Sequence, residues 1–233
     1  MNKSNLKQSI KQHFGILFRL RDAYHAIINN YYAPLQKYKY GSFGKNSMMQ
    51  IPASISDRGL IYLDDYVRVR NNFCFDGFRG KLIIKKYTAI GRNAVVVTSN
   101  HTKTVGVGQF YLGPLHTNDN CKDITIGEDV WVGANCTLLP GCKIGRGCLI
   151  GACSMVNKEL PPYAVAVGCP AKIIASCFTI DEIIKHEEII YAPEERISRA
   201  ELESIFETYY TDKKSIGKDN LTETDILRIK SLY

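Results

Sequence analysis

The sequence predicts an all-β solenoid, a parallel β-helix, that carries α-helical extensions at both ends. Two observations predict it: aliphatic residues recur every six positions within 124–158, and helical spacing is found only outside the repeat. Neither an amphipathic helix nor a simple alternating strand gives a period of six. The repeated positions are Ile126, Val132, Leu138, Ile144, Ile150 and Val156, and glycine follows four of them.

Each six-residue unit is interpreted as a short strand with inward, outward and inward side chains, followed by a tight corner. Three such strands close one triangular coil, and stacked coils bury ladders of like residues. The positions two residues earlier are also aliphatic or small, and the cysteines among them are expected to be core residues rather than ligands. These positions are Ile124, Val130, Cys136, Cys142, Cys148 and Ser154. The same six-residue spacing occurs earlier at Ile84, Ile90 and Val96, and a weaker form of it at Ile61, Val67 and Phe73.

The chain is therefore divided into an N-terminal helical segment (1–45), a β-helix (46–177) with a loop at 103–122, and a C-terminal helical extension (178–233). An apolar helical face is expected in the first segment, made by Ile10, Phe14, Leu17, Leu20, Tyr24, Ile27, Ile28 and Tyr31. We expect this face to pack on the first coil; the nearby basic residues also allow weak contact with an acidic membrane surface.

Three short helices are predicted after Cys177, each opened by a Ser/Thr-x-x-acid box. The boxes begin at Thr179, Ser198 and Thr222. These helices are expected to cover the far end of the coil stack, as terminal caps must.

Composition and charge narrow the function classes. The 233 residues are 45% hydrophobic and 23% charged, with no apolar run long enough to cross a membrane. Eight cysteines without a CxxC pair argue against a disulfide scaffold and a zinc site, and favour a reducing, cytoplasmic location. The net charge is +7, but residues 1–177 carry +12, which favours anionic partners; no cluster dense enough for nucleic acid is found.

The repeat also predicts which side chains face outward. Trp131 lies between inward Val130 and Val132, so it is expected to be exposed. If the ladder is extended one step beyond Val96, Thr102 faces inward and His101 faces outward. The repeat then stops for about twenty residues, and a loop of that length is typical of a functional site. A histidine on a strand below such a loop is a candidate general base.

Several segments resemble the hexapeptide-repeat acetyltransferases, most closely the sugar and polysaccharide O-acetyltransferases together with the galactoside, maltose and streptogramin enzymes. The similar segments are Ser99-Asn-His-Thr, Ile124-Thr-Ile-Gly-Glu-Asp-Val-Trp-Val-Gly-Ala-Asn, Leu139-Pro-Gly-Cys-Lys-Ile-Gly, Ile150-Gly-Ala-Cys-Ser-Met-Val-Asn-Lys and Val167-Gly-Cys-Pro-Ala-Lys-Ile-Ile.

The resemblance implies a left-handed β-helix, a homotrimer, and acetyl-CoA as the donor, bound between neighbouring subunits. It implies that His101 is the catalytic base. The residues that match the family's CoA-binding positions are Trp131, Ala134, Ala152, Asn157, Lys158 and Lys172. Asp76, Asn100, Tyr111 and His116 are the candidates for acceptor contacts. No metal site is expected.

The function favoured is acetyl-CoA-dependent O-acetylation of a sugar or polysaccharide hydroxyl, with His101 removing the hydroxyl proton. N-acetylation of an amino sugar stays open, because the sequence does not separate a hydroxyl from an amine acceptor.

Two further alternatives stay open. A zinc enzyme resembling the γ-type carbonic anhydrases needs three protein ligands, and only His101 and His116 lie in or beside the repeat. A non-catalytic binding or assembly platform explains the ladder, but it does not predict the outward histidine and tryptophan.

Overall fold

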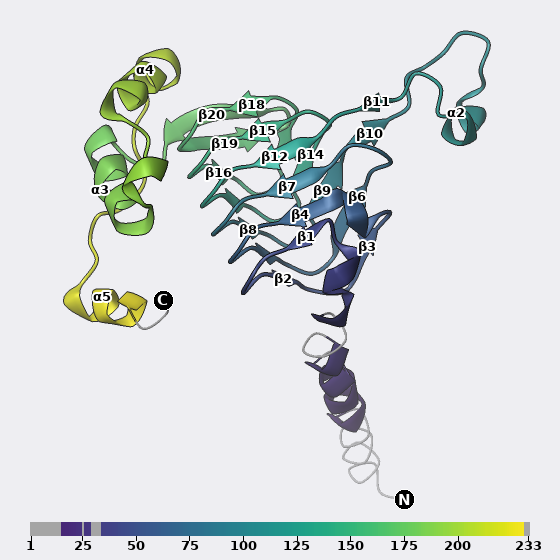
Figure 1. Cartoon of the computed structure of the whole chain (residues 1–233), viewed down its shortest axis with the longest axis horizontal. Helices are drawn as coiled ribbons and strands as arrows, with labels where there is room; N and C mark the ends of the chain where they lie inside the picture. Colours follow the sequence, from purple (N-terminus) through teal and green to yellow (C-terminus); the bar gives the residue numbers. More distant parts are fainter. Residues whose placement is uncertain (1–14, 25, 29–33, 231–233) are drawn as a thin grey trace, which may run out of the picture.

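The chain forms a three-sided parallel β-helix, seen in a computed structural model that describes residues 15–24, 26–28 and 34–230 (Figure 1). Each coil contributes one strand to each of three sheets, and strands of successive coils pair in parallel. The predicted solenoid is confirmed.

Three flat sheets make the sides of the prism. Sheet A contains β1 (Ser42–Phe43), β4 (Ile61–Leu63), β7 (Leu82–Ile84), β12 (Ile124–Ile126), β15 (Lys143–Ile144) and β18 (Glu159–Leu160). Sheet B contains β2 (Met48–Met49), β5 (Arg68–Val69), β8 (Ala89–Ile90), β13 (Trp131–Val132), β16 (Leu149–Ile150), β19 (Ala164–Gly168) and β20 (Ala171–Ser176). Sheet C contains β3 (Ala53–Ile55), β6 (Phe73–Asp76), β9 (Val95–Val97), β14 (Thr137–Leu138) and β17 (Met155–Val156).

The interior of the prism holds the predicted ladders. Every repeated aliphatic from Ile126 to Val156 is buried, and so is every residue two positions before them. Cys136, Cys142 and Cys148 are free thiols within this core. Burial raises the pKa of Cys142 and of Cys148 to about 12, because the charged thiolate loses its hydration. These cysteines are therefore core residues, as predicted.

The corner between sheets B and C carries an asparagine ladder. Asn72, Asn93 and Asn135 stand on successive coils in the left-handed backbone region, which asparagine tolerates better than most residues. Asn72 Nδ2 donates to Asn93 Oδ1 (3.0 Å), and Asn93 Nδ2 donates to Asn135 Oδ1 (2.9 Å). Cys153 takes the same place on the next coil, so the ladder ends at a thiol that is 4.0 Å from Asn135 Nδ2.

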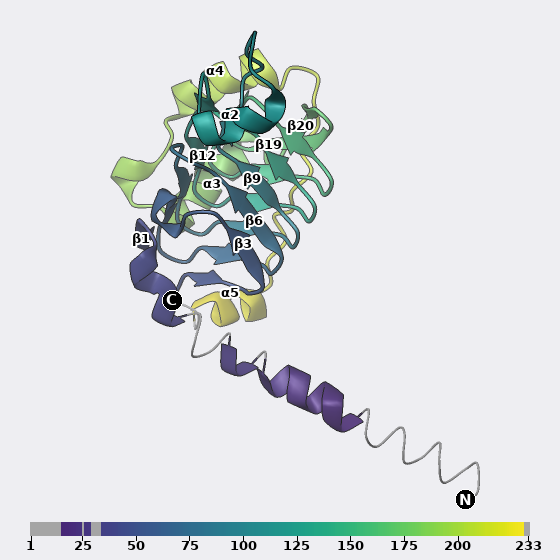
Figure 2. The ribbon, with the colours of Figure 1, turned by 90° about the vertical axis from the view of Figure 1, so that its right-hand side faces the viewer.

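The N-terminal helix stands clear of the β-helix. Residues 15–24 and 26–27 are helical, and the segment extends away from the first coil (Figures 1 and 2). The expectation that its apolar face packs on the first coil is wrong for the described residues, because Leu17, Leu20 and Ile27 are exposed. The first coil is instead covered by the 3₁₀ helix η2 (Pro34–Lys39) and the partly buried Tyr40 and Phe43. Ile10, Phe14 and Tyr31 lie outside the described residues.

All three predicted C-terminal helices are present: α3 (Ile180–Ile190), α4 (Arg199–Tyr209) and α5 (Glu223–Lys230). At the start of each helix, a side-chain hydroxyl accepts a hydrogen bond from the backbone N–H three residues later. These hydroxyls belong to Thr179, Ser198 and Thr222. Only α4 covers the end of the core, through Ile205 and Phe206, whereas α3 follows the corner between sheets A and B. The helices therefore cap the end only in part.

A buried carboxylate joins α3 to the β-helix. Glu187 is 1% exposed and accepts hydrogen bonds from Tyr163 Oη (2.8 Å), Arg146 Nη1 (3.2 Å) and the backbone N–H of Ile197 (2.6 Å). The Arg146 guanidinium also lies 4.2 Å from the centre of the Tyr191 ring. Because a buried charge is tolerated only when it is paired, this network holds the extension in one position.

None of the helices that the structure describes is both long and apolar enough to cross a bilayer.

Candidate active site

The coil is interrupted once, at the corner between sheets C and A, by an insertion that begins after β9. The chain leaves the coil at Thr98, forms the antiparallel pair β10 (Ser99–Asn100) and β11 (Asn120–Cys121), and returns into β12. Thr98 is buried and donates from Oγ1 to the carbonyl of Gly80 (2.8 Å), which anchors the base of the insertion to the preceding coil.

Thr102 is exposed, so the prediction that it faces inward is wrong. The inward ladder cannot be extended past Val96, because the chain turns outward from the coil two residues later. The last inward-facing residue at this corner is Thr98. His101 is outward as predicted, with 39% of its side chain exposed.

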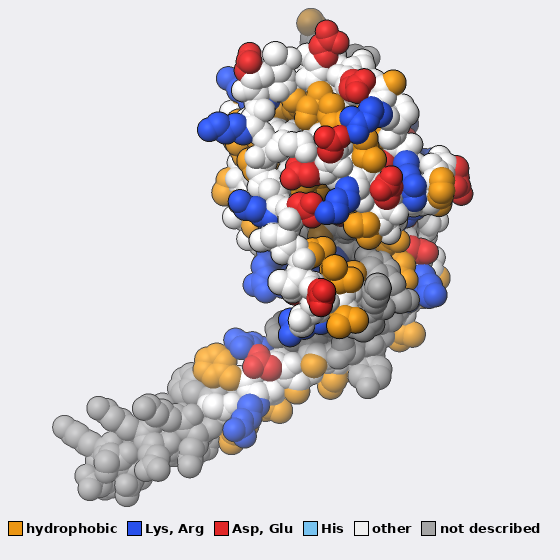
Figure 3. Space-filling view, turned by 90° about the vertical axis from the view of Figure 1, so that its left-hand side faces the viewer, with side chains coloured by type: hydrophobic (Ala, Val, Ile, Leu, Met, Phe, Trp, Pro, Cys, Tyr) orange, Lys and Arg blue, Asp and Glu red, His pale blue; other side chains and the backbone are white. Residues whose placement is uncertain are grey.

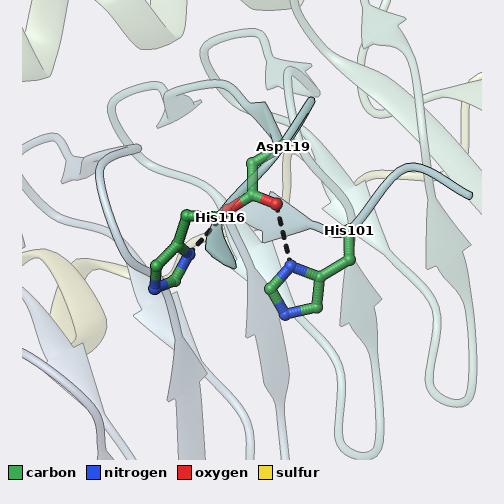
Figure 4. A group of neighbouring side chains, drawn as sticks. All are labelled: His101, His116 and Asp119. Carbon is green, nitrogen blue, oxygen red and sulfur yellow. Dashed lines mark hydrogen bonds and ion pairs between the residues drawn. The ribbon is translucent and has the colours of Figure 1, made fainter. Parts of the chain in front are cut away.

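Two histidines share one carboxylate in this insertion (Figure 4). His101 Nδ1 lies 2.8 Å from Asp119 Oδ1, and His116 Nδ1 lies 2.8 Å from Asp119 Oδ2. The Asp119 side chain is only 5% exposed, and the ring centres of the two histidines are 5.9 Å apart. Residues 18 positions apart in the sequence are thus placed together by the β10–β11 hairpin.

The shared carboxylate determines the protonation of both rings. An ionised carboxylate only accepts hydrogen bonds, so both imidazoles must donate from Nδ1. These bonds, first the one from His101 and then the one from His116, hold the pKa of Asp119 below its ordinary value. In its neutral form each ring therefore has an unprotonated Nε2, the atom that a general base uses.

His116 is supported from the other side by an aromatic stack. Its ring lies parallel to Phe78, with 3.7 Å between ring centres and 4° between planes, and the Arg79 guanidinium lies 4.9 Å from the Phe78 ring centre. The backbone N–H of Phe78 donates to Ser99 Oγ (3.1 Å), which ties the stack to β10.

The distal part of the insertion is not structureless. It forms α2 (Gln109–Leu115), which presents Gly113 to the catalytic candidate: a Cβ at Gly113 would lie 3.8 Å from His101 Nε2. Tyr111 is exposed on α2, next to exposed Phe110, and Leu112 is buried. The absence of a side chain at position 113 leaves space beside the reactive nitrogen.

The other acceptor candidates lie near this corner. Asp76 is exposed at the end of β6, one coil before the insertion, and Asn100 is exposed in β10, adjacent to His101. In the described part of the chain, the hydrogen-bond partner of both histidines is Asp119, and neither Asp76 nor Asn100 is bonded to them.

The histidine pair and Asp119 also place one potential ligand atom each within 4.8 Å of one another. A count of histidines alone therefore underestimated the ligands available to a metal ion. In the structure, however, both Nδ1 atoms are engaged with the carboxylate, an arrangement that orients two bases.

The residues matched to CoA contacts lie on several sides of one protomer. Trp131 is exposed on sheet B, as predicted, in a depression of about 230 Å³ that is also lined by Phe178 and Ile216. Lys172 is exposed on β20 of the same sheet. Ala134 and Ala152 lie at the corner between sheets B and C, whereas Asn157 and Lys158 lie at the corner that carries the insertion. A single chain does not bring these residues together around His101.

Two residues of the site were missed by sequence reasoning. Asp119 lies in a polar loop, and nothing in the sequence pairs it with His101. Phe78 lies in the segment before the insertion, where only Asp76 was chosen as a candidate acceptor contact. The available signal was an aromatic residue between Gly77 and Gly80.

Comparison with known proteins identifies the repeat and the fold. Residues 123–158 match the family model described as bacterial transferase hexapeptide (six repeats). The chain is 31% identical over 144 residues to the "Putative lipopolysaccharide biosynthesis O-acetyl transferase WbbJ" of Escherichia coli (strain K12), covering 57% of this chain and 70% of that protein. It is 50% identical over 115 residues to a chloramphenicol acetyltransferase of Klebsiella aerogenes, covering 44% of this chain. The match spans 55% of the length of that relative.

A solved structure of an acetyltransferase has a similar fold. A hexapeptide-repeat acetyltransferase from Vibrio cholerae O1 biovar eltor, in complex with acetyl coenzyme A, superposes with a TM-score of 0.56 at 25% identity, covering 66% of this chain and 84% of that one. The fold and the repeat together confirm the left-handed parallel β-helix expected from the resemblance. The chain belongs to the hexapeptide-repeat acetyltransferase family.

Proposed function

We propose that this protein transfers an acetyl group from acetyl-CoA to a hydroxyl of a sugar or polysaccharide, with His101 as the general base. The observation that carries the proposal is the hydrogen bond between His101 Nδ1 and Asp119, which leaves Nε2 as a proton acceptor in an exposed position. The acetyl-CoA complex of the Vibrio cholerae relative supports the donor, and the name of the Escherichia coli relative supports a glycan hydroxyl as acceptor.

The residues present suffice for direct transfer. As the acceptor oxygen attacks the thioester carbonyl carbon, its proton moves to His101 Nε2. Asp119 stabilises the imidazolium through the bond to Nδ1. When the carbon–sulfur bond breaks, the imidazolium returns the proton to the departing thiolate, so the products are the ester and CoA. General-base catalysis of this kind contributes about 10²–10⁴-fold in rate.

The active unit proposed is a homotrimer in which each site lies between two copies. This follows from the placement of the CoA candidates, because Trp131 and Lys172 lie on sheet B, whereas His101 lies at the opposite corner, between sheets C and A. The insertion supports this arrangement. It projects from the body (Figure 1). Its Val105, Phe110 and Leu115 are exposed apolar side chains that a neighbouring copy would cover. Lys158 and Lys172 then meet the phosphates of CoA as point charges.

N-acetylation of an amino sugar is the second candidate, because the same base and donor serve an amine. Incubating the protein with acetyl-CoA and a panel of neutral, acidic and amino sugars, while following CoA release, tests both. Esters among the products support O-acetylation, amides support N-acetylation, and no CoA release together with no CoA binding indicates a binding platform.

The shared site is tested by mixing two variants, one without the base and one with weakened CoA binding, at acetyl-CoA concentrations where each variant alone has little activity. His101→Ala and Lys172→Ala subunits, unfolded and refolded together, are expected to regain activity, because some mixed trimers pair an intact base with an intact CoA surface. No recovery in verified mixed trimers would place each site within one protomer.

A further inference from the structure

The N-terminal helix carries a stripe of exposed apolar side chains. At 100° per residue, one arc of about 100° holds five exposed apolar residues. They are Ile16, Leu17, Leu20, Tyr24 and Ile27, whose exposed fractions lie between 54% and 61%. Soluble proteins rarely leave such a contiguous surface open unless it binds something.

The charged residues of this helix are distributed around the stripe. Arg19 follows one edge of the arc and Arg21 the other, whereas Asp22 lies on the opposite side of the helix. The Arg21 guanidinium lies 5.0 Å from the Phe18 ring centre and pairs with Asp22 (2.7 Å), and all three side chains are exposed. Figure 3 shows hydrophobic and basic side chains on the segment that projects from the β-helix.

The net charge of the chain is concentrated in the same segment. Residues 1–45 contain eight Lys and Arg residues and one acidic residue, Asp22, which is a net charge of +7. The remaining 188 residues contain 22 basic and 22 acidic residues, so they are neutral as a whole. Residues 1–45 therefore carry +7 of the +12 found in residues 1–177, and the β-helix (46–177) carries the other +5, which the acidic C-terminal extension offsets.

We propose that the N-terminal helix binds the surface of an anionic lipid bilayer, with the stripe in the acyl boundary and the flanking arginines at the headgroups. An exposed apolar arc bordered by basic residues is the arrangement that such interfacial helices need. Charge decides between this occupant and a second copy of the helix, because identical helices with a net charge of +7 per segment repel each other, whereas an anionic surface attracts them. The surface would hold the β-helix beside lipid-linked or membrane-bound acceptors.

Flotation of the full chain with vesicles tests this proposal independently of catalysis. Vesicles of phosphatidylcholine alone are compared with vesicles containing about one third phosphatidylglycerol, at low and high salt. The wild type is expected to float only with the anionic vesicles, and less at high salt. The double variant Arg19→Gln/Arg21→Gln is expected to bind about 30-fold more weakly, since each basic residue near an anionic surface contributes roughly fivefold.

The apolar stripe is tested separately. The uncharged stripe variant Leu20→Gln/Ile27→Gln is expected to lower vesicle binding at least about 100-fold, because two apolar side chains no longer leave water. The matched control is Ile189→Gln on α3, a site with 68% exposure and no part in the stripe, which is expected to bind like wild type.

Equal flotation with neutral vesicles, flotation unchanged in Leu20→Gln/Ile27→Gln, or no flotation at low salt would each overturn the proposal. Sedimentation equilibrium tests the rival occupant, a second copy of the helix. If the wild type does not bind vesicles and its assembly dissociates when the stripe is substituted, copies of the helix cover one another.

Discussion

Replacing Asp119 by asparagine tests how the site orients its base. The carboxylate has two acceptor oxygens, and each receives one imidazole Nδ1–H at 2.8 Å. An amide of the same size has one acceptor oxygen and an NH₂ group, so only one of the two rings can keep its Nδ1–H tautomer. The other ring must carry its proton on Nε2, where it can no longer act as a base.

The expected loss follows from these two arrangements. If the amide oxygen faces His101, the base survives but its imidazolium loses an anionic partner; if the NH₂ group faces it, the base is blocked. General-base catalysis is worth about 10²–10⁴-fold, so we expect kcat to fall about 10²-fold. Because the pKa of Asp119 lies below its ordinary value, the carboxylate is ionised throughout the neutral range, and the deficit should persist across that range.

The assay is the initial rate of CoA release at saturating acetyl-CoA, together with the dissociation constant of CoA, which should not change. Asp219→Asn is the matched control, since Asp219 Oδ1 accepts a hydrogen bond from Lys185 Nζ (2.8 Å) on the C-terminal extension, outside the insertion. A kcat for Asp119→Asn within about threefold of wild type would refute the role assigned to the carboxylate.

Three further predictions concern the scaffold. Glu187→Gln is expected to lower the free energy of unfolding in urea by about 2–4 kcal/mol, because it removes the buried carboxylate that pairs with Arg146 and leaves Glu128 (3.3 Å) as the remaining charged partner. Exposed Glu188→Gln should change it by less than about 0.5 kcal/mol, and equal effects would show that the buried network is not stabilising. Cys153→Asn is expected to add about 1 kcal/mol by continuing the ladder from Asn135, and an unchanged urea midpoint would contradict the ladder's role. The thiol of Cys142, with a pKa of about 12, should resist iodoacetamide at pH 8 in the native protein while exposed Cys153 reacts; mass spectrometry before and after unfolding reports both, and rapid native labelling of Cys142 would contradict its burial.

The repeat was sufficient to predict the coil, its buried ladders and the outward direction of Trp131. Inward positions in a β-helix are specified locally, because each strand of two or three residues must put an aliphatic residue into the prism. The capping boxes predicted the starts of the C-terminal helices for the same reason, because a threonine or serine side chain accepts a hydrogen bond from a backbone N–H only three residues away.

The errors arose where contacts are not local. Thr102 was placed inward because the ladder was continued beyond the point at which β10 leaves the coil. Asp119 was missed because its two partners meet it only after the hairpin closes. The N-terminal helix was expected to pack because apolar faces usually do, but helical spacing does not specify the surface that a face contacts.

The most direct test of the account is the turnover of His101→Ala, measured alongside its affinity for CoA. The account predicts that kcat falls by about 10²–10⁴-fold while the dissociation constant of CoA is unchanged, because the imidazole moves a proton and does not hold the donor. A variant that turns over like wild type would contradict the central claim, and the base would have to be sought elsewhere in the insertion, first at His116.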